Sequence, residues 1–111
     1  MSDLNYVIAS DLNIWIDTLK NVSKALEQCL GKAGLLLLEQ ECGPEFFDLK
    51  TRLAGELFQK FINYQVAIAL VIPEPSRYGE RFVELALEHT NHSQIRFVKS
   101  SQAAKEFLNS R

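Results

Sequence analysis

The feature that most limits the fold is an unbroken apolar run over residues 66–72, followed by Pro73 and Pro75. A second apolar run covers residues 35–38 and is too short for a helix. Apolar runs between turn-forming residues are typical of strands that are covered on both faces. Such strands occur in parallel sheets whose connections carry helices. The two runs therefore predict an α/β fold, with residues 66–72 as the central strand.

Strands and helices are expected to alternate along the whole chain. Two further strands are expected at residues 6–9 and 95–97, and the order βαβαβαβα implies a mostly parallel sheet of four or five strands with right-handed crossovers. The length of 111 residues suits one core, so we expect a single domain over residues 1–111. Four helices are expected, over residues 11–30, 45–63, 76–89 and 101–108. The first should carry Trp15, Cys29 and Leu30 on its apolar side. Ser76 and Ser100 are the expected N-caps of the last two helices.

The predicted helix over residues 45–63 is apolar around more of its circumference than one sheet can cover. One stripe faces the sheet and contains Phe46, Leu53, Leu57, Phe61 and Tyr64, and Ala54 extends it. A second strip lies beside it and consists of Phe47, Phe58 and Ile62, with Thr51 and Gly55 alongside. Two interpretations stay open: neighbouring helices cover this second strip, or it is the interface of a homodimer or of a complex with another protein. Gly55 would then allow close backbone approach.

Polar residues of the same segment are the candidates for a ligand site. They are Asp48, Lys50, Glu56, Lys60, Asn63 and Tyr64. A solvated helix face, with weak pairs such as Glu56 with Lys60, explains the charges equally well. An enzyme would have to use Asp48, Lys50 and Glu56, although no nucleophile, metal or phosphate-binding loop accompanies them.

Residues 45–64 read EFFDLKTRLAGELFQKFINY. This sequence resembles the signature of a bacterial family known as domain of unknown function 4180, approximately E-F-F-D-L-K-T-x-L-A-G-E-I-L-Q-K-F-x-N-Y before an apolar strand. The resemblance covers most of the chain from Leu35 onward. The chain has Ile72-Pro73-Glu74 where the family tends to have Gly-Asp, and Ser93 where a glycine is usual.

The family's layout is similar to the SpoIIAA-like (STAS) fold. In that fold a helix after a buried strand carries a regulatory phosphorylated serine in an Asp-x-Ser-Gly motif. Thr51 is the hydroxyl in the comparable region of this chain, although the motif itself is absent. The resemblance therefore makes Thr51 a candidate phosphosite.

Metal and thiol chemistry have little support in the sequence. His89 and His92 with Glu88 would need further ligands for a metal ion, and histidines at a helix end are typical partners of terminal carbonyls. We expect no metal and no cofactor, because the Walker, GxGxxG, HExxH and GxSxG motifs are absent. Cys29 is expected in the core, and Cys42 in a loop is the better candidate for a reactive thiol.

Charge and hydropathy argue against nucleic-acid binding and against insertion into a membrane. The formal net charge of −2 gives no basic face for nucleic acid, and no apolar run is long enough for a membrane span. The first residues lack the pattern of a signal peptide, so a cytoplasmic protein is expected. The leading hypothesis is a non-catalytic regulatory or protein-interaction module. The alternative is a small-molecule or lipid-binding domain with a pocket between the 45–63 segment and the loops at the strand ends.

Overall fold

The computed structural model describes residues 5–111 and contains a four-stranded sheet in which all neighbours are parallel. The strands are β1 (Tyr6–Ile8), β2 (Gly34–Leu38), β3 (Ala67–Val71) and β4 (Ile95–Val98), and they lie in the order of the sequence. The predicted α/β class and the four predicted strands are confirmed. β3 is buried along its whole length, as expected for a central strand.

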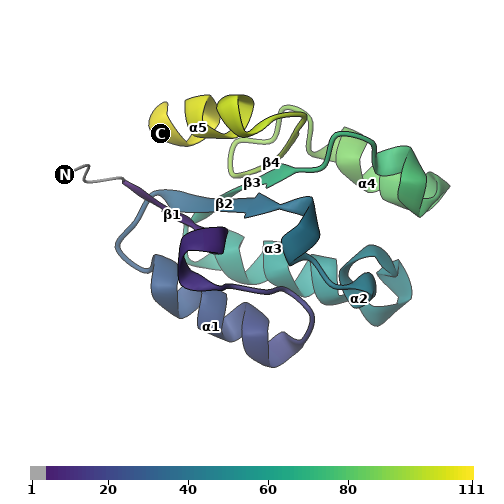
Figure 1. Ribbon diagram of the computed structural model, residues 1–111, viewed down its shortest axis with the longest axis horizontal. Coiled ribbons are helices and arrows are strands. Elements are labelled where there is room, and N and C mark those ends of the chain that lie inside the picture. The colour runs from purple at the N-terminus through teal and green to yellow at the C-terminus, as the bar shows by residue number, and fades with distance from the viewer. Residues whose placement is uncertain (1–4) are drawn as a thin grey trace.

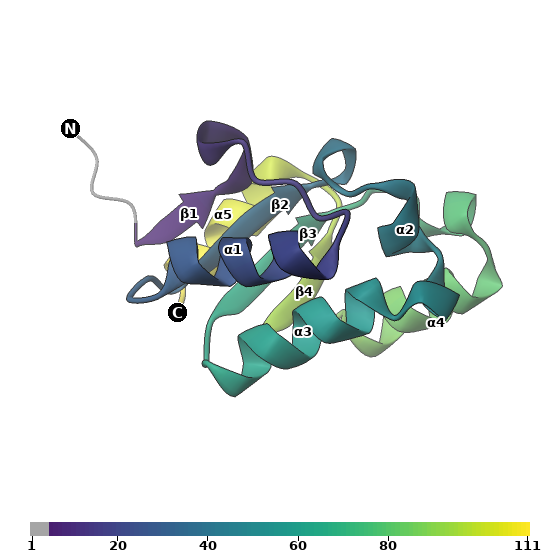
Figure 2. The same cartoon turned by 90° about the horizontal axis from the view of Figure 1, so that it is seen from below.

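Helices cover both faces of the sheet, but unequally (Figures 1 and 2). α5 (Ser101–Asn109) lies alone on one face, while α1 (Leu19–Cys29) and α3 (Leu53–Asn63) lie on the other with α4 (Glu80–Glu88) beside α3. Alternate residues of β2 serve the two faces: Leu35 and Leu37 enter the core under α1, α3 and α4, whereas Leu36 packs in the core under α5. Short connections complete the chain, namely α2 (Pro44–Phe47) and the 3-10 turns η1 (Ala9–Leu12), η2 (Glu39–Glu41), η3 (Leu49–Thr51) and η4 (Pro75–Tyr78).

The first helix begins later than predicted. η1 ends at Asn13, whose φ is 54°, and the chain then runs extended until the Thr18 side chain caps α1. In this extended stretch Ile16 forms a parallel bridge with Cys42. Trp15 therefore lies on the surface instead of on the apolar side of a helix, and Leu30 is also exposed.

The predicted helix over residues 45–63 is wrong as a continuous element. It is divided into α2, η3 and α3, and Arg52 between η3 and α3 has a φ of 64°. The Thr51 hydroxyl lies 2.6 Å from the carbonyl oxygen of Glu45 and 2.8 Å from that of Asp48, and it accepts a hydrogen bond from the Leu53 N–H. Most of the predicted stripe is nevertheless buried, namely Phe46, Leu53, Ala54, Leu57 and Phe61. Tyr64 was predicted on the same stripe but is 61% exposed, because α3 ends at Asn63.

The two remaining helices differ in how they start. Ser100 caps α5 by accepting a hydrogen bond from the Ala103 N–H at 3.1 Å, as predicted. Ser76 caps no helix, because it lies inside η4, and Gly79 with a φ of 101° separates η4 from α4. Along the described chain, no helix has the length and apolar character needed to cross a membrane.

Candidate functional site

The second strip of the 45–63 segment is covered from within the chain. Phe58 is 5% exposed and packs edge-on against Phe97, with 6.0 Å between ring centroids, and against His89 at 5.1 Å. Phe47 and Ile62 are half-buried against the same core. These contacts favour the first interpretation, in which neighbouring elements hide the strip, and they remove the premise that Phe58 is free to contact a partner. A homodimer stays a prediction.

Gly55 lies open on the surface, as an interface would need, whereas the Thr51 hydroxyl is engaged within the chain. A Cβ added to Gly55 would meet nothing within 4 Å, so no other part of the chain approaches its backbone. The Thr51 hydroxyl is engaged with backbone groups of its own loop. Phosphorylation of Thr51 stays a prediction, and it would have to displace those contacts.

A cleft lies between the segment from Phe47 to Lys50 and the start of α4, and its volume is about 580 Å³. One wall is aromatic. The rings of Phe47 and Tyr78 are stacked, with 3.7 Å between centroids and 7° between planes, and both meet Phe82 edge-on. The residues lining the cleft are Phe47, Asp48, Leu49, Lys50, Tyr78, Gly79, Glu80, Arg81 and Phe82.

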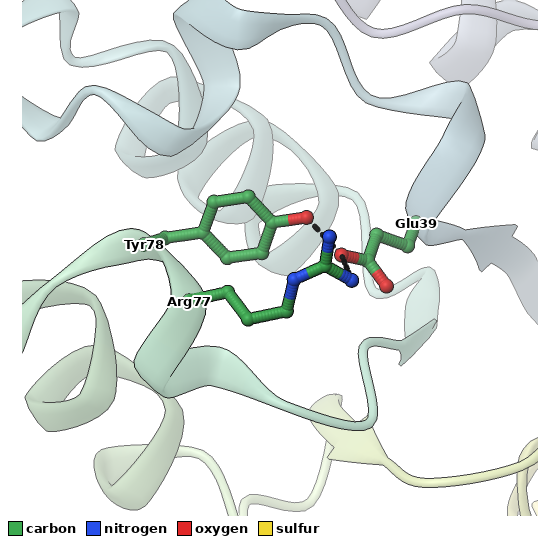
Figure 3. A network of polar contacts seen from close by, with 3 residues as sticks. All are labelled: Glu39, Arg77 and Tyr78. Atoms are coloured by element: carbon green, nitrogen blue, oxygen red, sulfur yellow. Dashed lines mark hydrogen bonds and ion pairs between the residues drawn. The ribbon is translucent and has the colours of Figure 1, made fainter.

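A polar network holds the aromatic wall in place (Figure 3). The Tyr78 hydroxyl donates a hydrogen bond to a carboxylate oxygen of Glu39, and the Arg77 guanidinium lies 3.8 Å from the same oxygen. Glu39 directly follows β2, so the network ties η4 to the carboxyl end of that strand. The Arg77 side chain is largely exposed, and its ion pair therefore contributes less than the hydrogen bond of Tyr78.

Two cationic side chains reach the cleft without an ionic partner. Lys50 and Arg81 form no ion pair with any carboxylate of residues 5–111. Gly79 precedes α4 and offers no side chain to cap it, so the N-terminus of α4 is uncapped where residues 79–82 line the cleft. The Asp48 carboxylate accepts a hydrogen bond from the Lys50 N–H at 3.1 Å and caps η3. Glu80 is the remaining acid on the rim of the cleft.

The predicted polar residues do not form one site. Asp48 and Lys50 line the cleft, but Glu56, Lys60, Asn63 and Tyr64 lie outside it on α3 or at its end. Asn63 accepts a hydrogen bond from Gln59 at 2.8 Å along the helix. The convergence of Asp48, Lys50 and Glu56 that the enzyme hypothesis needs is therefore not found.

Sequence reasoning missed half of the cleft, namely Tyr78, Glu80 and Arg81, together with their support from Glu39. A usable signal was present, because ligands of α/β proteins bind beyond the carboxyl ends of the strands, and these residues follow β2 and β3. The hypothesis of a ligand pocket between the 45–63 segment and the strand-end loops stays a prediction.

The ring nitrogens of both histidines contact backbone groups. Nδ1 of His89 lies 2.8 Å from the Leu85 carbonyl, while Nδ1 of His92 accepts hydrogen bonds from the N–H groups of Gln94 and Ile95. Burial, with His89 and Arg96 nearby, lowers the pKa of His92. In the described part of the chain, no three His, Cys, Asp or Glu side chains are grouped to hold a metal ion.

The surroundings of Cys42 disfavour a reactive thiol. Cys42 is buried, and burial together with the charges of Glu41 and Glu39 raises its pKa, which disfavours the nucleophilic thiolate. Cys29 is in the core as predicted, where burial raises its pKa to about 12.

Comparison with known families gives one match. The model of a family described as "Domain of unknown function (DUF4180)" matches residues 2–108 of the chain. No curated protein and no solved structure matches it.

Proposed function

We propose that this chain, which belongs to the DUF4180 family, is a non-catalytic binding module for a small ligand that carries both an aromatic or apolar group and an anionic group. The ligand would occupy the cleft between the Phe47–Lys50 loop and the start of α4. The supporting observation is that an aromatic wall and two unpaired cations border the same concave surface.

Each part of the cleft would recognise one part of the ligand. The edges of Phe47 and Tyr78 offer apolar surface for a ring. Lys50, Arg81 and the uncapped N–H groups of α4 all attract negative charge. Glu80 opposes an anion at the same rim. Substitutions at Arg81 and Glu80 should therefore change the affinity in opposite directions.

Phenyl phosphate is a suitable probe, because it joins a ring to a phosphate. In ¹H–¹⁵N NMR titrations it should shift the amide signals of Lys50 and of residues 79–82. Phenol and inorganic phosphate, each carrying half of the chemistry, should bind more weakly. Shifts scattered over the surface, or equal affinity for all three compounds, would count against the proposal.

Matched charge variants test the same cleft. Arg81→Gln should weaken phenyl phosphate binding about tenfold, which corresponds to about 1.4 kcal/mol. Glu80→Gln should strengthen it. Lys105→Gln makes the same change of charge on the exposed surface of α5 and should leave affinity unaltered. Equal effects of Arg81→Gln and Lys105→Gln would mean that the probe responds only to net charge.

A further inference from the structure

A second concave site lies around Trp15, away from the cleft. Its neighbours Ile14 and Ile16 are buried, and the Ile16 backbone is fixed on both sides. The Ile16 N–H donates to the Glu41 carbonyl at 2.8 Å, and the Gly43 N–H donates to the Ile16 carbonyl at 2.9 Å. Because side chains alternate along an extended chain, Trp15 points outward and is 53% exposed. The fold therefore fixes the backbone next to Trp15 and leaves its indole exposed.

The indole forms a wall of a small pocket. This pocket has a volume of about 180 Å³, and it is lined by Ser10, Asn13, Ile14, Trp15, Gln40 and Glu41. On its other side Trp15 borders a separate pocket of about 320 Å³ against α1, where Lys24 lies. Unlike this neighbouring pocket, the smaller one has a carboxylate in its lining, that of Glu41.

Glu41 is the one charged side chain that is buried among residues 5–111, with 5% exposure. One of its carboxylate oxygens, Oε1, accepts a hydrogen bond from the Leu38 N–H at 2.9 Å. No donor of the described residues reaches the other oxygen. Burial raises the pKa of this carboxyl group, the hydrogen bond from the Leu38 N–H lowers it, and the negative charge of Asp11 raises it, with a net shift upward.

We propose that the pocket of Trp15 and Glu41 binds the ammonium group of a small primary alkylamine. An ammonium group supplies the hydrogen-bond donors that the second oxygen of Glu41 lacks, and its charge neutralises the buried carboxylate. The indole of Trp15 attracts the same cation through its π face. The short apolar chain of the amine would pack against the side chains of Ile14 and Trp15, which line the pocket. The nearby carboxylate of Asp11 favours a cation over an anion.

Trp15 is the single tryptophan of the chain, so its fluorescence reports on the pocket directly. n-Butylammonium is the probe, and n-butanol, which has the same chain without the charge, is the comparator at equal ionic strength. A saturable change in emission with n-butylammonium and none with n-butanol is expected. ¹H–¹⁵N spectra should place the shifts at residues 10–16 and 38–42. Equal responses to both compounds, or shifts elsewhere, would overturn the proposal.

Glu41→Gln is the decisive variant, because it removes the charge and keeps an oxygen for the Leu38 N–H. Affinity for n-butylammonium should fall at least about tenfold. Glu27→Gln makes the same change on the exposed surface of α1 and should bind like the unaltered protein. Equal weakening in both variants, or none in Glu41→Gln, would refute a specific role of Glu41. If Glu41→Gln fails to fold, the position of the ¹H–¹⁵N shifts in the unaltered protein still tests whether n-butylammonium binds in this pocket.

Discussion

The phenolic hydroxyl of Tyr78 donates a hydrogen bond to the carboxylate of Glu39, which lies 39 positions earlier in the sequence. This contact joins the carboxyl end of β2 to the turn that precedes α4, and it holds Tyr78 in its stack on Phe47. The aromatic wall of the cleft therefore depends on a polar contact outside the cleft. Removal of the Tyr78–Glu39 hydrogen bond should therefore lower both the stability of the protein and the affinity of the cleft for its ligand.

Tyr78→Phe removes the hydroxyl and preserves the ring. We expect the free energy of unfolding to fall by about 1 kcal/mol, the usual net value of a partly exposed hydrogen bond to a charged group. Urea denaturation of Tyr78→Phe, Glu39→Gln and the double variant measures the coupling between the two residues. Arg77→Gln is the control and should cost less than about 0.5 kcal/mol, because its ion pair is solvated. Additive effects of Tyr78→Phe and Glu39→Gln would show that the hydrogen bond contributes nothing.

Strands β2 and β3 were predictable because a buried parallel strand is the one structure that explains such short, wholly apolar sequences. Residues 35–38 and 66–72 are apolar without a polar face, and a parallel sheet with helices on both sides is the structure that hides such runs. The predicted bounds agree with β2 and β3 to within about one residue at each end. Most of the core was predicted as well, but Trp15 and Leu30 were expected on an apolar helix face and are exposed, because the local backbone there is not the predicted helix.

The breaks in the helices were not predictable from periodicity. Phe46 and Leu53 keep the spacing of one helical stripe, so the pattern continues through Arg52, where the backbone leaves the helix. No glycine or proline marks that position. The cleft was only half predicted for a related reason: Lys50 stands in a conspicuous sequence, whereas Arg81 joins it solely through the packing of two distant segments.

The Thr51 hydroxyl should be a measurable part of the break between η3 and α3. Thr51→Val replaces the hydroxyl by a methyl group of similar size and leaves the Leu53 N–H without its acceptor. We expect a loss of about 1 kcal/mol, as for other capping hydroxyls, and nearly full stability in Thr51→Ser. Thermal unfolding of the two variants gives the comparison. Thr51→Glu should destabilise at least as much as Thr51→Val, because a bulky anion cannot reproduce the contacts with the Glu45 and Asp48 carbonyls; a stable Thr51→Glu would favour the phosphorylation hypothesis.

His92 should make stability depend on pH below neutrality. Its Nδ1 accepts hydrogen bonds from Gln94 and Ile95 and can do so only when it carries no proton. Burial, then the nearby His89 and Arg96, place its folded-state pKa below the unfolded value of about 6.5. As the pH falls through about 6.5 the unfolded chain takes up the proton first, so stability present above that pH is lost on acidification.

His92→Asn isolates this effect, because the asparagine side-chain oxygen can accept the same N–H groups but does not titrate. The difference in unfolding free energy between about pH 7.5 and about pH 5 should be smaller in His92→Asn than in the unaltered protein. Chemical denaturation at the two pH values measures it. His92→Ala should be less stable than His92→Asn at both. An identical pH dependence in the unaltered protein and His92→Asn would show that His92 does not titrate across this range.

Gly34 is required by close packing on the α5 side of the sheet. A Cβ at this position would lie 2.6 Å from Cδ2 of Leu108 and 2.7 Å from the Ala67 carbonyl oxygen. The oxygen belongs to the backbone of the neighbouring strand and cannot move aside. Gly34→Ala should therefore destabilise the protein by about 1–3 kcal/mol, as overpacking of a core does. Gly34→Ala with Leu108→Ala should recover little, because the clash with Ala67 persists. Full recovery in urea denaturation would assign the strain to Leu108 alone.

For Gly55 we expect the opposite effect of substitution by alanine, and the same variant tests whether α3 is a dimer interface. It lies on the exposed side of the first turn of α3, and an added Cβ would meet nothing. Gly55→Ala should stabilise the isolated chain by about 0.5–1 kcal/mol through helix propensity and a smaller unfolded-state entropy. If a second copy packs closely on this helix, the new methyl group should instead weaken that assembly. Sedimentation velocity at several concentrations, combined with urea denaturation, separates the two. We expect higher stability and unchanged mass, because Phe58 beneath this surface is already covered by His89 and Phe97; a concentration-dependent dimer that Gly55→Ala dissociates would restore α3 as an interface.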